Sequence, residues 1–209
     1  MLLQPTYRYV QAKKSGTVRF TKQIKKKLRQ ALASAGRRVL LFADEAGFTL
    51  HAKLGRVWAQ RGSRPVVMTR SQHRARLNLF GWVNPLSGER GLMSAAHGNT
   101  AAFVQFLEQI LVAHPTQLIQ LWVDNASWHK GEVVTTWLKT HGRLKLFYHP
   151  PYHPELNCQE PVWKRIRYEV TTGLYATQLA AVERSIRDTV ASWSNEKVKR
   201  FCVAKCKLS

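Results

Sequence analysis

Two apolar runs, each closed by a carboxylate, constrain the fold of this chain more than any other feature. They are RVLLFAD, residues 38–44, and LIQLWVD, residues 118–124. Strands that are apolar on both faces occur in parallel or mixed sheets covered by helices. The carboxyl ends of such strands open into a crevice, so Asp44 and Asp124 could share a site there. For either acid taken alone, the competing interpretation is a cap for the next helix.

The remaining apolar patterns predict an α/β fold. The order is strands first, then helix alternating with strand, then helices, which favours a mixed sheet of about five strands flanked by helices. An antiparallel meander would continue through right-handed crossovers into parallel strands, with the strands of Asp44 and Asp124 side by side. Gly47 is expected to permit a turn after the first strand, and Thr100 to cap a helix. Further strands are expected at 51–60, 77–83, 91–96 and 144–148, and helices at 21–35, 100–113, 132–140, 158–170 and 178–193.

The chain is expected to divide at its N-terminal end. Residues 1–36 are interpreted as a basic arm, extended over 7–20 and helical over 21–35, where lysines face away from an apolar side. Those lysines form either a solvated face or a face that contacts phosphates. Residues 37–209 form one domain with helices at its C-terminal end, a size that suits a single core.

The charge of the chain narrows the class of partner. Its 33 Lys and Arg outnumber its 12 Asp and Glu, which gives a formal net charge of +21. A compact domain with that charge favours a polyanionic partner, above all nucleic acid. No run is long enough to span a membrane, and the N-terminus has no signal-peptide core. We expect a reducing compartment, the cytosol of a bacterium or the nucleus of a eukaryote, because the chain has only three cysteines.

The scarce acids suggest a chemistry that the basic surplus would serve. Asp44 and Asp124 close buried strands, while Glu155 and Glu160 lie in and after the segment HPPYHPELNCQEPVW. Neighbouring carboxylates repel unless a cation separates them, and Mg²⁺ prefers oxygen ligands. Two such ions can activate a water or a 3′-hydroxyl and stabilise the leaving oxygen of a phosphodiester. The alternative is a structural role, in which these acids are helix caps and salt-bridge partners.

Three motifs give the chain a family resemblance. They are Asp44-Glu45 after a strand, Asp124-Asn125-Ala126 with His129, and the block from Pro151 to Trp163, which is the most specific of the three. With 35 residues between Asp124 and Glu160, the chain resembles the catalytic domain of IS630-type transposases in the Tc1/mariner superfamily. The resemblance implies an RNase H-like fold and a DDE site that cuts transposon-end DNA and transfers the strand to target DNA.

Carried over by motif, the resemblance implies catalytic and metal-binding roles for three acids. Asp44 is the first, Asp124 the second and Glu160 the third, with Mg²⁺ as the cofactor and Mn²⁺ as a substitute. Glu155 and Glu45 are not expected to be ligands, and Glu45 is expected to point to the other side of its strand. Asn125 and His129 are expected to shape the site or contact DNA, and Trp163 to pack its helix against the sheet.

The resemblance also implies partners: double-stranded DNA, a second copy of the chain on that DNA, and no membrane. The chain departs from the family pattern at Cys158 and Gln159, where proline and an aliphatic residue are usual. It also starts in what resembles the linker after a helix-turn-helix region. We therefore expect one of three cases: a second frame joined by frameshifting, with a separate helix-turn-helix partner; a truncated copy; or a fragment of a longer chain. The expected location is the bacterial cytoplasm, in association with the nucleoid.

Two other functions fit parts of the sequence. A decayed or truncated transposase could act only as a basic DNA-binding protein, without catalysis. A zinc-binding module is the other, because histidine and cysteine side chains gather near the proline-rich segment and the C-terminus. Its ligands would come from His149, His153, Cys158, Cys202 and Cys206.

Overall fold

The computed structural model describes residues 14–34, 36–51, 60–64, 66, 68, 75–151, 153–173 and 175–206. The strand expected at 51–60 and the first part of the expected arm lie mostly outside this set.

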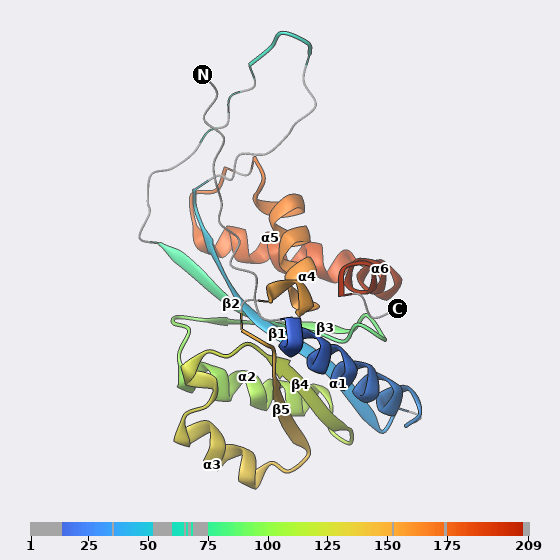
Figure 1. Ribbon diagram of the computed structural model, residues 1–209. Coiled ribbons are helices and arrows are strands. Elements are labelled where there is room, and N and C mark those ends of the chain that lie inside the picture. Colours follow the sequence, from blue (N-terminus) through green and yellow to red (C-terminus); the bar gives the residue numbers. More distant parts are fainter. Residues whose placement is uncertain are drawn as a thin grey trace.

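A five-stranded mixed sheet forms the centre of the protein (Figure 1). The strand order is β3-β2-β1-β4-β5, and β1 pairs antiparallel with β2 and parallel with β4. The pairing of β2 with β3 is antiparallel and that of β4 with β5 is parallel. The prediction of a mixed sheet with about five strands is confirmed. Its strands are β1 Arg38–Thr49, β2 Arg76–Val83, β3 Arg90–Ala95, β4 Leu118–Val123 and β5 Leu144–Tyr148.

Helices cover both faces of the sheet, as expected for strands that are apolar on both sides (Figure 1). Helices α2 Thr100–Ala113 and α3 Glu132–Thr140 pack on one face. The opposite face is covered by α1 Lys14–Leu32, α4 Gln159–Ile166, α5 Leu179–Ser192 and α6 Asn195–Cys206. Short 3₁₀ turns lie at η1 Ser127–His129 and η2 Pro154–Leu156, and the π-helical turn η3 Arg167–Thr171 follows α4. Within the described ranges, no helix combines the length and the apolar character that a membrane crossing needs.

Strand β1 is longer than the sequence pattern indicated. It does not end at Asp44 but continues to Thr49, because β2 pairs with it from Phe42 onward while its pairing with β4 stops at Phe42. The turn expected at Gly47 is therefore wrong. Gly47 pairs with Asn78 inside the ladder, so Asp44 lies within a strand rather than at its end.

Helix α1 also differs from the prediction. It begins at Lys14, so the extended conformation expected up to residue 20 is wrong for 14–20. Its apolar side packs on the sheet: Phe20, Ile24 and Ala31 are buried, and the Phe20 ring meets the edge of Trp122 at 5.1 Å between centroids. Tertiary burial of that side explains the additional helical turns, since short helices gain most of their stability from packing.

Two smaller corrections concern helix ends. Asn99, not Thr100, caps α2, because its side chain accepts a hydrogen bond from the Ala102 N–H at 2.9 Å. The helix expected over 158–170 divides into α4 and η3. The segment before α4 contains the turn η2. A further helix, α6, follows residue 193, where no helix was predicted.

Alternation along β1 separates the two cores. Leu40 and Phe42 belong to the core under α1 and α4, whereas Leu41 and Ala43 belong to the core under α2 and α3. Successive side chains of a strand point to opposite faces. Asp44 therefore projects toward the α4 side and Glu45 toward the α2 side, which confirms the expectation for Glu45.

Candidate functional site

Three carboxylates line one cavity beyond the C-terminal ends of β4 and β5, beside the middle of β1. Asp44 comes from β1, Asp124 follows β4 directly, and Glu160 lies in the first turn of α4. The cavity has a volume of about 380 Å³. The sequence pattern predicted all three acids, and the fold brings them to the same cavity. The remaining walls are Asn125, Ala126, His149, Pro150, Pro151, His153, Pro154 and Asn157.

The register of the sheet explains why two of these acids meet. Strands β1 and β4 are parallel neighbours, and Phe42 pairs with Trp122. Continuing that register by two residues on each strand sets Asp44 opposite Asp124. The predicted adjacency of the two strands is confirmed.

Asn157 fixes the third acid relative to β1. Its Nδ2 donates to the Ala43 carbonyl at 3.1 Å, and its Oδ1 accepts from the Gln159 N–H at 3.0 Å. The Glu160 N–H donates to the Asn157 carbonyl at 3.2 Å. The buried asparagine therefore binds the first N–H of α4 and ties the start of this helix to the residue before Asp44.

Trp163 holds the same helix against the sheet, as expected. The side chain is fully buried and meets the edge of Phe48 at 6.1 Å between centroids. A Cβ at Gly81 would lie 2.6 Å from the Trp163 ring, so glycine at this position of β2 lets α4 approach closely. Helix α4, and Glu160 with it, is positioned by core packing as well as by the hydrogen bonds of Asn157.

Asn125 closes the cavity on the other side by joining the ends of β4 and β5. Its Nδ2 donates to the His149 carbonyl, and its Oδ1 accepts from Lys130 Nζ at 2.6 Å. This amide thus bridges two parallel strand ends. The expectation that Asn125 shapes the site agrees with these contacts.

Negative charge accumulates at Asp44. Burial raises the pKa of this carboxyl well above its usual range, and the charges of Glu45, Glu160 and Asp124 raise it further. Asp124 behaves in the opposite way, because a hydrogen bond from His129 lowers the pKa of its carboxyl. Burial and the neighbouring acids therefore disfavour the ionised form of Asp44, whereas the ionised form of Asp124 is favoured.

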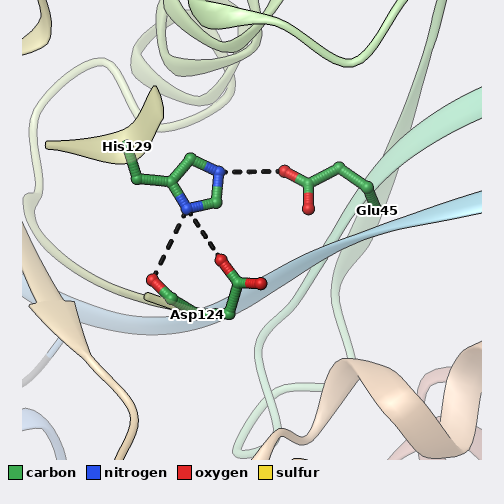
Figure 2. Close-up of side chains that lie close together, drawn as sticks. All are labelled: Glu45, Asp124 and His129. Carbon is green, nitrogen blue, oxygen red and sulfur yellow. Dashed lines mark hydrogen bonds and ion pairs between the residues drawn. The ribbon is translucent and has the colours of Figure 1, made fainter. Parts of the chain in front are cut away.

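His129 lies beside the cavity and contacts two of these acids (Figure 2). Its Nδ1 is 2.9 Å from Asp124 Oδ1, and its Nε2 is 3.0 Å from Glu45 Oε1. Burial alone would lower the pKa of His129, but the two carboxylates raise it to about 9. The ring is therefore a cation at neutral pH, held between two anions.

This second cluster differs from the three cavity acids. Within the described ranges, Glu45, Asp124 and His129 are the only group of three such side chains whose ligand atoms all lie within 4.8 Å of one another. Each ring nitrogen of His129 already contacts a different carboxylate, so neither offers a lone pair to an ion. The three cavity acids are spaced more widely, and Asp124 belongs to both groups.

The zinc cluster considered from the sequence is not assembled in the described part of the chain. No group containing His149, His153, Cys158 or Cys202 has ligand atoms close enough to hold an ion. His149 is instead buried among rings: Phe20 at 5.4 Å and Phe42 at 5.7 Å between centroids. The Cys206 side chain lies outside the description.

Two cavity residues were not predicted to lie at the acidic site. His149, considered only as a zinc ligand, follows β5 directly, so the rule that places ligands at the carboxyl ends of parallel strands could have indicated it. Asn157 stands two residues before α4, where the preference of asparagine for helix caps was a usable signal.

Comparisons with known proteins place this fold and site in a family. The family model of the DDE superfamily endonucleases matches residues 39–183. The Insertion element IS630 uncharacterized 39 kDa protein of Shigella sonnei is 24% identical over 149 residues, which are 71% of this chain and 43% of that protein. The chain thus spans less than half of this curated relative.

Solved structures share the fold. The catalytic domain of Mos1 mariner transposase superposes with a TM-score of 0.65 at 13% identity, covering 97% of this chain and 94% of that one. The Mos1 Strand Transfer Complex gives 0.68 at 16% identity, with 99% and 63% covered. The mariner Mos1 paired end complex with Mg also gives 0.68, at 17% identity, with 99% and 64% covered. The fold is the RNase H-like fold of transposase catalytic domains, as the resemblance predicted. Because the family model covers more than half of its length, the chain belongs to the DDE superfamily of endonucleases, as a DDE domain of the IS630 and Tc1/mariner type.

Proposed function

We propose that this chain cuts transposon-end DNA and joins the 3′ ends to target DNA, with divalent cations held by Asp44, Asp124 and Glu160. Mg²⁺ is the proposed cofactor, and Mn²⁺ its substitute. The observation that carries the proposal is the cavity beyond the C-terminal end of β4, which Asp44, Asp124 and Glu160 all line.

The donor set of the cavity fits such cations. Its acidic ligands are all carboxylates, and hard divalent ions prefer oxygen. Burial and, to a smaller extent, the charges of Glu45, Glu160 and Asp124 raise the pKa of Asp44 and disfavour its ionised form, and a bound cation would favour that form again. When bound there, the metal would supply activation of a water or 3′-hydroxyl and stabilisation of the leaving oxygen.

The protein's own residues orient and enclose the acids. Asn157 holds Glu160 close to β1, and Asn125 holds the ends of β4 and β5 together. His149 contributes an apolar wall, since burial lowers its pKa to about 4 and keeps the ring neutral. These contacts hold the carboxylates in place before substrate arrives, which reduces the reorganisation that catalysis requires.

The surface along α1 suits a DNA backbone. The hollow along α1 is lined by Lys22, Lys25, Lys26, Arg29, Gln30 and Ala33 and has a volume of about 560 Å³. Helix α1 contains no acidic residue, and its buried side packs on the same face of the sheet as α4. Phosphates bound along this helix would lie on the side toward which Asp44 and Glu160 project.

The similar solved structures support the proposed reaction, DNA cleavage followed by strand transfer, through the complexes they contain. They include a strand transfer complex and a paired end complex with Mg, both of Mos1. For this chain we propose double-stranded DNA as substrate and a homodimer assembled on that DNA. We also propose a separate helix-turn-helix partner that recognises the transposon ends. The proposed location of the chain is the bacterial cytoplasm, in association with the nucleoid.

The test is nicking of supercoiled DNA by the purified chain with Mg²⁺ or Mn²⁺. We expect nicking that requires the metal and is lost in Asp124→Asn. The matched control is Asp188→Asn, an exposed aspartate on α5, which should leave nicking unchanged. Unchanged nicking in Asp124→Asn would remove this acid from the site. DNA affinity without Mg²⁺ or Mn²⁺ binding by calorimetry would instead indicate a DNA-binding protein that lacks catalysis.

A further inference from the structure

The two oxygens of Asp124 have different surroundings. Oδ1 accepts a hydrogen bond from the Ala126 N–H at 3.0 Å and forms an ion pair with His129 Nδ1 at 2.9 Å, and the same Nδ1 lies 3.5 Å from the Asp124 carbonyl oxygen. Among the described residues, Oδ2 has no hydrogen-bond donor, and Figure 2 shows it directed away from the His129 ring. The carboxylate therefore has one saturated oxygen and one available oxygen.

His129 is itself firmly placed. Only 1% of its side chain is exposed, and the ring stacks on Trp128 at 5.1 Å and lies 4.2 Å from the Phe103 ring. Its second nitrogen is held by Glu45, which projects from β1 to this side of the sheet. Three elements, α2, η1 and β1, therefore fix the ring that contacts Asp124.

We propose that His129, anchored by Glu45, is a positioning residue that restricts Asp124 to binding metal through Oδ2 alone. This inference rests on the proposed function, because it assumes that Asp124 is a metal ligand. The hydrogen bond from Nδ1 occupies Oδ1, so a cation in the cavity meets one oxygen in a fixed orientation. Outer contacts of this kind orient ligands and tune metal affinity.

The same arrangement assigns different tasks to the adjacent acids of β1. Asp44 faces the cavity as a proposed ligand, whereas Glu45 faces His129 and acts only through it. The orientation of Asp124 is thus fixed from the α2 side of the sheet, while its other oxygen faces the cavity.

Two substitutions of His129 separate the effect of its contact with Asp124 from the effect of losing the imidazole charge. In His129→Asn the amide Nδ2 lies about where Nδ1 was, so the donor to Asp124 is kept and the donor to Glu45 is lost. In His129→Gln the amide lies nearer the Nε2 position, so the donor to Glu45 is kept and the donor to Asp124 is lost. Both variants remove the same positive charge, and each loses one hydrogen bond.

The measurement is Mn²⁺ binding to the full chain by calorimetry, with thermal unfolding recorded for every variant. We expect His129→Gln to bind Mn²⁺ at least about tenfold more weakly than His129→Asn, the lower end of the range for outer-shell contacts. The two melting temperatures should be similar. His141→Gln, a histidine at the end of α3, controls for loss of an imidazole elsewhere. Equal affinity in the two His129 variants would overturn the proposal.

A second pair of variants tests the anchor without changing His129. Glu45→Gln removes the charge but keeps an acceptor for Nε2, while Glu45→Met removes both. We expect weaker Mn²⁺ binding in Glu45→Met than in Glu45→Gln, and equal binding would contradict the role of Glu45. If the wild-type chain bound no Mn²⁺, the proposed function and this inference would both fall. A loss confined to the variants would leave the proposed function intact.

Discussion

The two faces of the sheet differ in charge and in what they do for the site. Helix α1, on one face, contains seven Lys and Arg and no acid, whereas α2 and α3, on the other, contain together one Lys and two Glu. Asp44 and Glu160 project to the basic face, and Glu45 to the other. The α1 face is thus the side proposed to bind DNA, and the α2 face holds the residues that position Asp124.

Two histidines show the same contrast on a small scale. Both are buried close to Asp124 and share an ordinary pKa of 6.5. On the α2 side, the carboxylates around His129 overcome burial and raise its pKa to about 9. On the α1 side, burial among aromatic rings lowers the pKa of His149 to about 4. Whether anionic partners accompany burial decides the charge of each ring.

The largest expected effect concerns the adjacent acids of β1. Asp44→Asn should reduce metal-dependent nicking to the level seen without metal, because it removes a proposed ligand. Glu45→Gln should lower the nicking rate by no more than about 10–100-fold, since Glu45 acts only through His129. Nicking rates of both variants under one metal concentration check this. Equal reductions of the nicking rate in the two variants would contradict the different roles proposed for Asp44 and Glu45.

The second prediction concerns stability on the His129 side. The folded pKa of about 9 exceeds the unfolded value of 6.5, so the stabilisation is complete below about pH 6.5 and is lost as the pH rises through 9. Its upper limit is roughly 3 kcal/mol. Urea unfolding of wild type and His129→Asn from pH 6 to 10 measures it. The difference between the two free energies of unfolding should shrink toward alkaline pH, and a constant difference would contradict a charged His129.

The third prediction concerns His149, for which the free energy of unfolding should change with pH in the opposite direction. The folded pKa of about 4 lies below the unfolded value, so the unfolded chain takes up a proton first as the pH falls below 6.5. Wild type should therefore lose up to roughly 3 kcal/mol between pH 6.5 and 4 that His149→Phe does not lose. Unfolding curves across that range provide the test. Parallel pH profiles for the two proteins would show that His149 is not held neutral.

The smallest expected effect concerns the basic face itself. Replacing Lys22 and Lys26 of α1 by glutamine should weaken DNA binding and lower the slope of log affinity against log salt by about 0.9 per lost phosphate contact. Lys139→Gln on α3 is the control on the opposite face and should leave the slope unchanged. Fluorescence anisotropy with a DNA duplex over a salt series, in the absence of divalent metal, measures both. An unchanged slope in the α1 variant would remove that helix from the DNA surface.

Much of the architecture was predictable because it depends on short-range patterns. The runs ending at Asp44 and Asp124 indicated buried parallel strands, and four of the five observed strands begin and end within one residue of their predicted bounds. The exception was the end of β1, because pairing with β2 beyond Asp44 leaves no signal in the strand's own residues. The start of α1 was missed for a similar reason, since Phe20 is stabilised in the helix by contact with Trp122, a hundred residues away.

The sequence by itself determined which acids could form a site: Asp44, Asp124 and Glu160, from strand patterns and a motif of fixed order. Only the tertiary structure decided how they are held. The Asn157 bond to Ala43, the Asn125 bond to the end of β5 and the His129 contact with Glu45 all join segments distant in the chain. Such contacts depend on strand register and on the face each side chain takes, which local sequence cannot specify. His129 was expected to shape the site or contact DNA, and the fold places it as a cation between Asp124 and Glu45.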